Sequence, residues 1–516
     1  MKLTFNDRKF TLTGASAETA PKSSQWLFNH AIKSYQTKNI KAAHAFKQHA
    51  SEAVKNIFNN LMLKPVPCPS VAPLTPEGLT LKPFQAERGV PFLLSQNKTY
   101  LAHQPGLGKS AQFVSAVNTN PGRALIICPS FLKINWAREV TKWSTLDFPN
   151  IAIIKDTVQQ DKVDWTADYV ICPISMLSKP WVIAGLLSTD FKYKCVDEVQ
   201  NFKTPGAERS IALWGGKTDT FTSPGLMYDC DFEIYLSGTP LLSKPIDIYP
   251  IIYGAAPEVI DFMSYNDFGF RYCGAWQNPR GAWIFNGSAR EQELHERLTA
   301  SFMQIIKKTD VLKDLPEKIR SVVVMDKDPR SANDRELDNT LLKEFENDGK
   351  KPTTMGAYAK MHHINGLAKV NWVADFVHYY LMQDPNEKII LYAYHRDVCE
   401  KLFLRLKHWA PDLVWGGLND NERMRIVDRF QDGFGRLIIG NEAMNSGLTL
   451  SKATRTVHAE YSTSPKINEQ AEDRANRIGA TGACSYHQYI VLPSGLDPVR
   501  LKSFHKREVA VNKIIY

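Results

Sequence analysis

Residues 103–110, HQPGLGKS, combine two glycines, a lysine and a serine in the spacing of a phosphate-binding loop. Glycines let backbone N–H groups close around phosphate oxygens, and the N-terminus of a following helix adds a favourable dipole. In such a loop Lys109 reaches the outer phosphates, and the hydroxyl of Ser110 is a ligand of Mg²⁺. The strict pattern has glycine where this chain has His103, so the loop alone also fits a glycine-rich turn without function.

An acidic pair, Asp197 and Glu198, ends an apolar run in the segment VDEVQNFK. At the end of a strand, Asp197 is suited to hold Mg²⁺, mostly through water, and Glu198 to orient or deprotonate an attacking water. The alternative is an exposed acidic turn, because such pairs are common. The chemical interpretation is favoured because the acidic strand end follows the phosphate loop along the chain.

Two arginines, Arg474 and Arg477, lie three residues apart in QAEDRANRIG. On a helix this spacing puts both side chains on one face. Planar guanidinium groups suit the charge that develops on a phosphate during transfer. Taken alone, the segment equally fits a helix in which the arginines pair with Glu472 and Asp473.

The elements that must position these residues form two series of short, β-rich apolar runs separated by amphipathic stretches. The runs lie at residues 99–103, 124–128, 168–172, 193–197 and 233–237, and then at 388–393, 436–440, 454–460 and 487–492. Buried parallel strands separated by helices give this alternation. The sequence therefore predicts two α/β lobes that divide between residues 315 and 365.

The N-terminal region has a different pattern. Residues 1–20 are interpreted as a strand pair or an arm, and residues 24–62 as two helices, because apolar residues recur at three- and four-residue steps between 40 and 61. Residues 64–78 contain five prolines, which block helix formation and indicate a linker.

Composition excludes several classes of protein. The 516 residues are 43% apolar and 23% charged, which is typical of globular domains. No apolar run has the length of a membrane span, and the first residues lack the apolar core of a signal peptide, so we expect an intracellular protein that is not secreted. Eight cysteines without a CxxC pair indicate neither a disulfide scaffold nor a cysteine-rich zinc site.

The charge is unevenly distributed. The net charge is +9, and residues 1–65 alone carry ten Lys and Arg against three Asp and Glu. A basic end on a nearly neutral body fits a polyanionic partner such as nucleic acid, although a lysine-rich soluble surface gives the same balance.

The order and the residue sequences of the motifs resemble those of the Swi/Snf ATPase family of superfamily-two, helicase-like motors. The matching segments are LKPFQ at 81–85, HQPGLGKS at 103–110, LIICPSFLKINWAREVTKW at 125–143, DEVQNFK at 197–203, LSGTP at 236–240, GNEAMNSGLTL at 440–450 and QAEDRANRIG at 470–479. Residues 272–318 resemble the HepA-related, annealing-helicase-like branch of that family. The resemblance covers about residues 80–495.

The resemblance implies an α/β fold with two RecA-like lobes, each a parallel sheet flanked by helices. The expected domains are a basic, mainly helical N-terminal domain (1–63), a Pro-rich linker (64–79), the first lobe (80–254), a helical insert (255–330) and the second lobe (331–516).

The resemblance also implies ATP and Mg²⁺ as ligands, and it assigns roles residue by residue. Lys109, Asp197, Glu198, Arg474 and Arg477 are the expected catalytic residues, with Ser110 and Asp197 as metal ligands. The expected nucleotide-binding residues are Gln85, Gly106, Leu107, Gly108, Lys109, Ser110, Gly447 and Gln470.

The chain departs from the family's motif sequences at His103, Gln104 and Gln200. It also departs at Ser462 to Ser464, where the family usually has Trp-Asn. Because the acidic pair and Lys109 are intact, we still expect the site to hydrolyse ATP despite the first three departures. The last concerns how strongly the motor couples to DNA, because an aromatic residue there can pack against the DNA path.

The function implied by the resemblance is ATP-driven translocation by a monomer on double-stranded or forked DNA, which remodels DNA structure or displaces bound protein. Residues 255–318 and 428–436 are candidate surfaces for DNA phosphates. Three alternatives remain open: an enzyme acting on RNA or single strands, a motor that docks on RNA polymerase or another protein through residues 1–65, and a DNA-binding module without hydrolysis.

Overall fold

The computed structural model describes most of the chain after residue 67 and four short backbone segments before it. The described residues are 2–6, 9–13, 27–29, 34–37, 68–155, 162–227, 229–238, 240, 244–278, 281–312, 317–348, 355–441, 444, 448, 450–462 and 464–476, followed by 484–502. Residues 68–82 contain neither helix nor strand, which agrees with a linker in this region.

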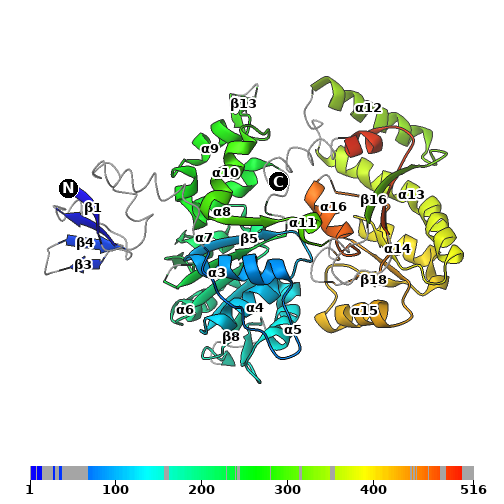
Figure 1. Cartoon of the computed structure of the whole chain (residues 1–516). Helices are drawn as coiled ribbons and strands as arrows, with labels where there is room; N and C mark the ends of the chain where they lie inside the picture. The colour runs from blue at the N-terminus through cyan, green and yellow to red at the C-terminus, as the bar shows by residue number, and fades with distance from the viewer. Residues whose placement is uncertain are drawn as a thin grey trace.

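The first lobe is built on a seven-stranded, all-parallel sheet (Figure 1). In spatial order its strands are β15 (Met303–Ile306), β5 (Lys98–His103), β12 (Phe232–Leu236), β9 (Tyr193–Asp197), β6 (Ala124–Cys128), β8 (Tyr169–Pro173) and β7 (Ile151–Ile153). Five of these strands coincide with the runs predicted from the sequence, so that prediction is confirmed for the first lobe.

Helices cover both faces of this sheet. The helices of the first lobe are α3 (Val90–Ser95), α4 (Lys109–Thr119), α5 (Lys133–Trp143), α6 (Pro180–Leu187), α7 (Glu208–Trp214), α8 (Tyr249–Ala255), α9 (Tyr265–Tyr272), α10 (Glu291–Ser301) and α11 (Lys308–Val311). Alternate strand residues point to opposite faces. Accordingly Leu101 packs in the core with α3, α4 and α5, whereas Tyr100 and Ala102 pack in the core with α6, α7 and α8.

The helical insert expected over residues 255–330 is smaller in the structure. Within that range, β15 extends the first sheet beside β5, and β16 (Glu317–Val324) belongs to the second sheet. Between them lie α9, α10 and a hairpin of β13 (Trp276–Gln277) and β14 (Trp283–Ile284). Helix α9 begins with a capping box in which Ser264 and Asp267 satisfy each other's backbone N–H groups.

The second lobe is built on a six-stranded sheet that is also all-parallel. Its strands, in spatial order, are β16, β21 (Cys484–Val491), β20 (Arg455–His458), β17 (Ile389–Tyr392), β19 (Leu437–Gly440) and β18 (Asp412–Val414). Its helices are α12 (Ala332–Asp348), α13 (Met355–Gln383), α14 (Arg396–Arg405), α15 (Asp420–Asp432) and α16 (Pro465–Glu472). The core with α13 and α14 lies on one face, and the core with α15 and α16 on the other.

The N-terminal region differs from its expected helical fold. Strands β1 (Lys2–Asn6), β2 (Lys9–Thr13), β4 (Ser34–Thr37) and β3 (Leu27–Asn29) form an antiparallel sheet in that order. The strand pair expected in residues 1–20 is therefore confirmed, but the helix expected from residue 24 is wrong over β3 and β4. Phe28 and Tyr35 are aromatic residues with strand propensity, and cross-strand pairing satisfies the backbone there. The helix expected between residues 40 and 61 lies outside the described residues.

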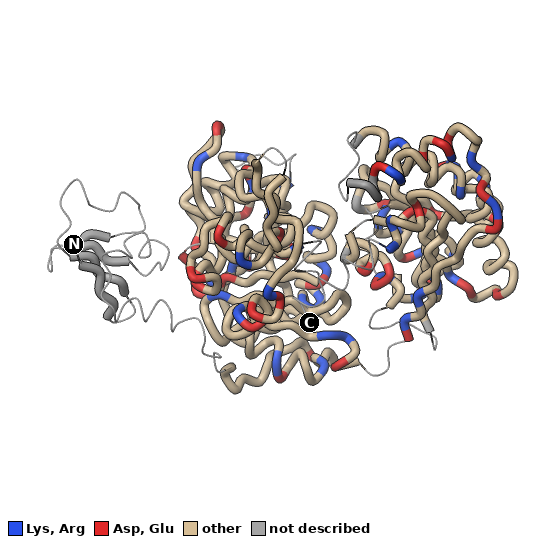
Figure 2. Tube along the Cα trace, turned by 90° about the horizontal axis from the view of Figure 1, so that it is seen from above, with Lys and Arg blue, Asp and Glu red and all other residues tan. Residues whose placement is uncertain are grey.

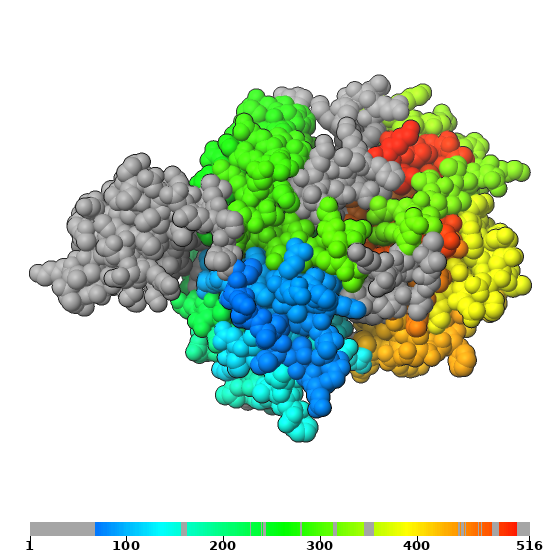
Figure 3. Space-filling model, in the orientation of Figure 1, coloured from blue at the N-terminus to red at the C-terminus, as the bar shows by residue number. Residues whose placement is uncertain are grey.

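The two lobes lie side by side, and the second lobe contacts the first directly (Figure 3). The Arg423 guanidinium of α15 lies over the ring of Phe131, and the Lys308 ammonium pairs with Asp473 at 2.8 Å. Lys and Arg are interspersed with Asp and Glu over both lobes (Figure 2). None of the helices in the described part of the chain combines the length and apolar character needed to cross a bilayer.

Candidate active site

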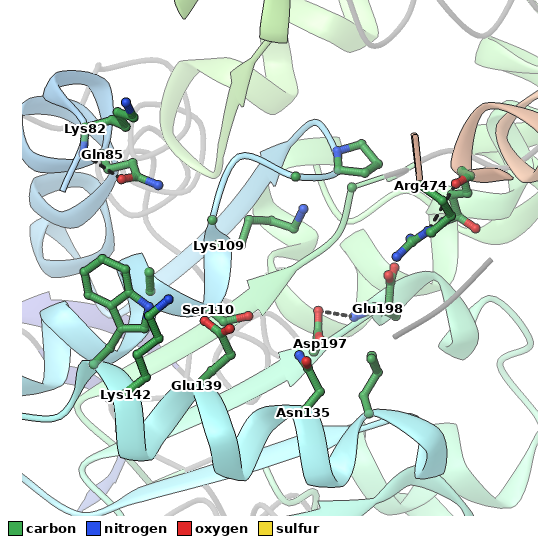
Figure 4. Close-up of a pocket in the computed structure, with 18 of the residues that line it drawn as sticks. Lys82, Gln85, Lys109, Ser110, Asn135, Glu139, Lys142, Asp197, Glu198 and Arg474 are labelled. Atoms are coloured by element: carbon green, nitrogen blue, oxygen red, sulfur yellow. Dashed lines mark hydrogen bonds between the residues drawn. The ribbon is translucent and has the colours of Figure 1, made fainter. Parts of the chain in front are cut away.

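A cavity of about 410 Å³ lies where the two lobes meet, and it contains most of the residues predicted from the sequence (Figure 4). From the first lobe it is lined by Thr80, Lys82, Gln85, Pro105, Gly106, Gly108, Lys109, Ser110, Ala111, Leu132, Asn135, Glu139, Lys142, Trp143, Asp197, Glu198 and Gly238. From the second lobe it is lined by Gln470 and Arg474. Gly447 and Arg477, which were also predicted, lie outside the described residues.

The phosphate loop connects the end of β5 to the start of α4. Gly106 and Gly108 have φ values of +85° and +70°, which side chains disfavour. A Cβ atom on Gly108 would also lie 2.4 Å from Nε2 of Gln85, so a side chain there would displace that amide. The Nζ of Lys109 donates a hydrogen bond to the carbonyl oxygen of His103, at 2.9 Å, and thereby stays inside the loop. The loop is thus shaped to receive phosphate oxygens at a helix N-terminus.

Gln85 links the entrance of the cavity to the loop. Its Nε2 donates to the carbonyl oxygen of Leu107 at 2.9 Å, and its Oε1 accepts from the backbone N–H of Lys82 at 2.8 Å. Leu107 itself does not line the cavity, because its side chain is buried with Phe84 and Ile306. Leu107 therefore anchors the loop by packing its side chain in the core and by accepting the Gln85 hydrogen bond at its backbone carbonyl.

The acidic pair lies at the end of β9, with Asp197 as the last residue of the strand, and it lines the same cavity as the loop. Trp136 Nε1 donates to Oδ2 of Asp197 at 2.9 Å, and the backbone N–H of Glu198 donates to Oδ1 at 2.9 Å. Enclosure in the protein, followed by the neighbouring carboxylate of Glu198, raises the pKa of Asp197. A divalent cation would favour the ionised carboxylate again, so Asp197 and the Ser110 hydroxyl form a donor set that fits Mg²⁺.

Glu198 is held in place by an amide side chain. Gln200 Nε2 donates to Oε2 of Glu198 at 2.5 Å, and the Ser237 hydroxyl donates to Oε1 of Gln200 at 2.7 Å. Ser237 opens the SGTP segment, so Gln200 connects the acidic pair to that segment. Glu198 adopts φ +52°, an unfavourable conformation for a residue with a side chain, and such strain is typical of functional sites.

The departures at His103 and Gln104 lie away from the cavity. The His103 ring is buried, its Nε2 lies 3.0 Å from Oε1 of Gln304 on β15, and burial lowers its pKa to about 3. Gln104 Oε1 accepts from the backbone N–H of Lys308 at 2.7 Å. Both side chains therefore stabilise the contact of β5 with β15 and with the start of α11, and they leave the phosphate loop intact.

The second lobe presents Gln470 and Arg474 from α16 and the turn after it. Arg474 Nη1 donates to the carbonyl oxygen of Leu448 at 2.9 Å, and Nε donates to the carbonyl oxygen of Gln470 at 3.3 Å. Backbone carbonyls thus hold the guanidinium, and it is not neutralised by an ion pair with a carboxylate in the described residues. Glu472 pairs with Lys318 and Arg320 instead.

Helix α5 supplies residues that the sequence analysis did not assign. Asn135, Glu139 and Lys142 line the cavity, and Trp136 orients Asp197 from within the core. The sequence did contain a sign of this helix's role, because the family's motif also has an Asn-Trp pair at the position of Asn135 and Trp136 in LKINWAREVTKW. Spacing alone could not assign a role to Trp136, because its partner lies 61 residues away in the chain.

Two family models match this chain in succession. The SNF2-related domain matches residues 84–333, and the helicase conserved C-terminal domain matches residues 368–479. Together they include all the cavity-lining residues except Thr80 and Lys82. The chain belongs to the Swi/Snf family of helicase-like ATPases.

Curated relatives of this Swi/Snf chain include two vertebrate proteins of the annealing-helicase branch. Human "DNA annealing helicase and endonuclease ZRANB3" is 29% identical over 81% of this chain and 39% of the relative. The Xenopus laevis "SWI/SNF-related matrix-associated actin-dependent regulator of chromatin subfamily A-like protein 1" is 28% identical over 81% of this chain and 42% of the relative. The chain spans about two fifths of the length of these relatives.

A solved structure, "Sulfolobus solfataricus SWI2/SNF2 ATPase core in complex with dsDNA", is 18% identical to this Swi/Snf chain. The alignment covers 87% of this chain and 99% of that one, with a TM-score of 0.40.

Proposed function

We propose that this protein is a DNA-dependent ATPase that moves along double-stranded or forked DNA and thereby remodels DNA structure or displaces bound proteins. The observation that carries the proposal is the cavity between the lobes, where the phosphate loop, the acidic pair and Arg474 meet. Such a site requires both lobes, so hydrolysis depends on their relative position.

The residues divide the work of hydrolysis. The backbone N–H groups of the loop and the Lys109 ammonium bind the phosphates, and Gln85 is placed to contact the base. Glu198 orients a water molecule and accepts its proton. Arg474 offsets the charge that develops on the transferred phosphate. Mg²⁺, when bound by Ser110 and Asp197, supplies positive charge next to the phosphates.

The geometry of the departures supports hydrolysis over a DNA-binding module without it. His103 and Gln104 point toward β15 and leave the loop intact. Gln200 holds Glu198 and contacts Ser237, so it connects the acidic pair to the SGTP segment. The three positions therefore leave Lys109, Asp197, Glu198 and Arg474 together at the cavity.

A second cavity supports nucleic acid as the partner. It has a volume of about 450 Å³ and lies at the carboxyl ends of β6, β7 and β8, where α15 of the other lobe begins. Its polar lining residues are Ser130, Lys133, Lys155, Ser175, Asn419 and Asn421. Lysines, hydroxyls and amides of this kind contact phosphate oxygens and carry little base specificity. We propose this cavity as part of the DNA path.

Two cations of residues 255–318, which the sequence analysis gave as a candidate DNA surface, already have partners within the protein. Lys308 is buried in its ion pair with Asp473, and Arg271 pairs with Glu293 at 2.7 Å. These two cations of the 255–318 region are engaged within the protein, so we do not include them in the DNA path.

Displacement of the third strand from a DNA triplex tests the proposed movement. The full chain with ATP and Mg²⁺ is expected to release the strand, and the Lys109→Ala variant is expected to fail. For the path, Lys133→Ala combined with Lys155→Ala should weaken duplex binding and its salt dependence. The matched control is Lys401→Ala, an exposed lysine of α14 that lines neither cavity. Hydrolysis of ATP on duplex DNA without strand release would contradict translocation.

A further inference from the structure

A group of histidines and one carboxylate converges in the second lobe, outside the residues that line the nucleotide cavity. His362 lies on α13, His395 directly precedes α14, and Glu460 follows β20 by two residues. Strands β17 and β20 are parallel neighbours, and Ala459 N–H donates to the carbonyl oxygen of Tyr392 at 2.9 Å. The segments after the two strands therefore lie together at the carboxyl edge of the sheet, where open α/β sheets bind ligands.

Glu460 stands at the centre of this group, and its side chain is 0% exposed. Its Oε2 accepts from the backbone N–H groups of Tyr394 and His395, both at 2.9 Å. Its Oε1 faces the two histidines: Nδ1 of His395 lies at 2.7 Å and Nε2 of His362 at 3.8 Å. One ligand atom from each of the three residues lies within 4.8 Å of the others.

The helix is shaped to bring His362 to this carboxylate. Gly366 lies one turn after His362 on α13, so both face the same side of the helix. A Cβ atom on Gly366 would lie 2.2 Å from Oε1 of Glu460. The absence of a side chain at residue 366 is therefore what allows α13 to pack directly on Glu460.

The buried carboxylate of Glu460 has no lysine or arginine as ion-pair partner among the described residues, so a bound cation could balance its charge. Among the described residues, both ion-pair partners of Glu460 are histidines. The nearby cations have other partners, since Lys369 pairs with Asp497 and Arg500 donates to the carbonyl oxygen of Tyr461. Buried carboxylates are found paired with a cation or bound to a metal ion.

We propose that His362, His395 and Glu460 bind a divalent transition metal ion, for which Zn²⁺ is the best match. Two histidines and one glutamate with a water as fourth ligand form a common tetrahedral Zn²⁺ set. Metal–ligand distances of about 2.0–2.2 Å put neighbouring ligand atoms roughly 3.3 Å apart. The separations of 2.7 and 3.8 Å to Oε1 lie on either side of that value. Imidazole ligands distinguish this site from the oxygen-only set that fits Mg²⁺.

A metal ion here would fix α13 to the segment that leads into α16. Ser462, two residues after Glu460, donates its backbone N–H to Oδ1 of Asn468 on α16, at 2.9 Å. Helix α16 in turn carries Gln470 to the nucleotide cavity. A bound metal ion would thus stiffen the segment that holds α16 and Gln470 at the nucleotide cavity. The metal site itself does not depend on the proposed function.

The test is zinc binding by the full chain after removal of metals with a chelator. Reloaded protein, separated from excess zinc, is analysed for metal content, and affinity is measured by competition with a chromophoric chelator. We expect one tightly bound Zn²⁺ per wild-type chain and at least a tenfold loss of affinity in His362→Ala. His362 makes no hydrogen bond among the described residues, so this variant should fold. Its melting temperature without zinc checks this directly.

The matched control is His378→Ala. His378 lies on the same helix, and its Nδ1 is 3.1 Å from Nε2 of the exposed His408, so this pair is the obvious competing site. Unchanged zinc content and affinity in His378→Ala, with loss in His362→Ala, supports the proposal. Wild-type protein that retains no zinc, or a His362→Ala variant that binds as tightly as wild type, overturns it. Equal loss in both variants also overturns it.

Discussion

In the first lobe, several side chains that face the nucleotide cavity are held by hydrogen bonds. Among the described residues, the second lobe adds only Gln470 and Arg474, from α16 and the turn after it. Gln85, Lys109 and Asp197 each have a partner within their own lobe. Arg474 is held by backbone carbonyls of its own lobe and meets the others only across the interface. From this difference we infer that the first lobe binds the nucleotide and that turnover requires the second lobe to approach it.

The largest expected effect separates binding from turnover. Arg474→Ala should lower the rate of ATP hydrolysis by about 10³-fold or more, because arginine contacts of this kind contribute roughly 10³–10⁵-fold. Nucleotide affinity should change little, because the first lobe holds the phosphates. Lys109→Ala, the matched variant in the first lobe, should abolish nucleotide binding itself. Equilibrium binding of a fluorescent ATP analogue, next to steady-state hydrolysis, distinguishes the two, and equal affinity losses would break the comparison.

The next effect concerns the residue that holds Glu198. Gln200→Ala removes hydrogen bonds to Glu198 and from Ser237, so we expect turnover to fall by up to about 10²-fold, the cost of a catalytic group misplaced by about 1 Å. Gln200→His, which restores the family's residue, should recover most of the rate. Single-turnover hydrolysis at saturating ATP measures this, and a KM effect without a rate effect would argue for a merely structural role.

The interface between the lobes can be weakened without touching the nucleotide. Lys308 of the first lobe donates to Asp473 at 2.8 Å, and both side chains are buried. Breaking a buried pair costs up to about 3–5 kcal/mol, and less here because Lys318 also contacts Asp473. Lys308→Met should therefore shift the lobes apart and slow hydrolysis several-fold. Energy transfer between dyes placed on the two lobes reports their separation. Unchanged transfer in Lys308→Met would contradict a role of the Lys308–Asp473 pair in holding the lobes together.

The smallest effect is on stability. The pKa of Asp197 is raised, so a cost to the folded state grows as the pH rises from the ordinary pKa of about 3.9 toward the raised one, and this cost is absent at lower pH. Without Mg²⁺, Asp197→Asn should therefore raise the melting temperature by roughly 2–4 °C at pH 8, with the gain disappearing near pH 4. Thermal unfolding at both pH values, in a chelating buffer, makes the test. A gain that is independent of pH would contradict ionisation of Asp197 as its cause.

The sequence was sufficient for the features that depend on local pattern. Both series of strands appear where apolar runs predict them, and the motif from Gly106 to Ser110 leads from β5 into the first residues of α4. Distant partners could not be predicted in the same way. Strands β15 and β16 were assigned to a helical insert, because their membership in two different sheets depends on neighbours far away in the chain.

Side-chain partnerships were also beyond local pattern. The ring of His103 sits beside Gln304, 201 residues away, and Lys308 pairs with Asp473, 165 residues away. The sequence analysis predicted a helix from residue 24, yet β3 and β4 form there, because β4 pairs with both β2 and β3. Such outcomes are decided by tertiary contacts, which override local propensity.

Steady-state ATP hydrolysis by the purified full chain tests the central claim most directly. It is measured without nucleic acid and with single-stranded DNA, duplex DNA, forked DNA or RNA, with Lys109→Ala as the control. The account predicts strong stimulation by duplex or forked DNA, and its loss in Lys109→Ala. Stimulation by RNA or single strands alone, or no hydrolysis under any condition, would contradict a motor that moves on double-stranded DNA.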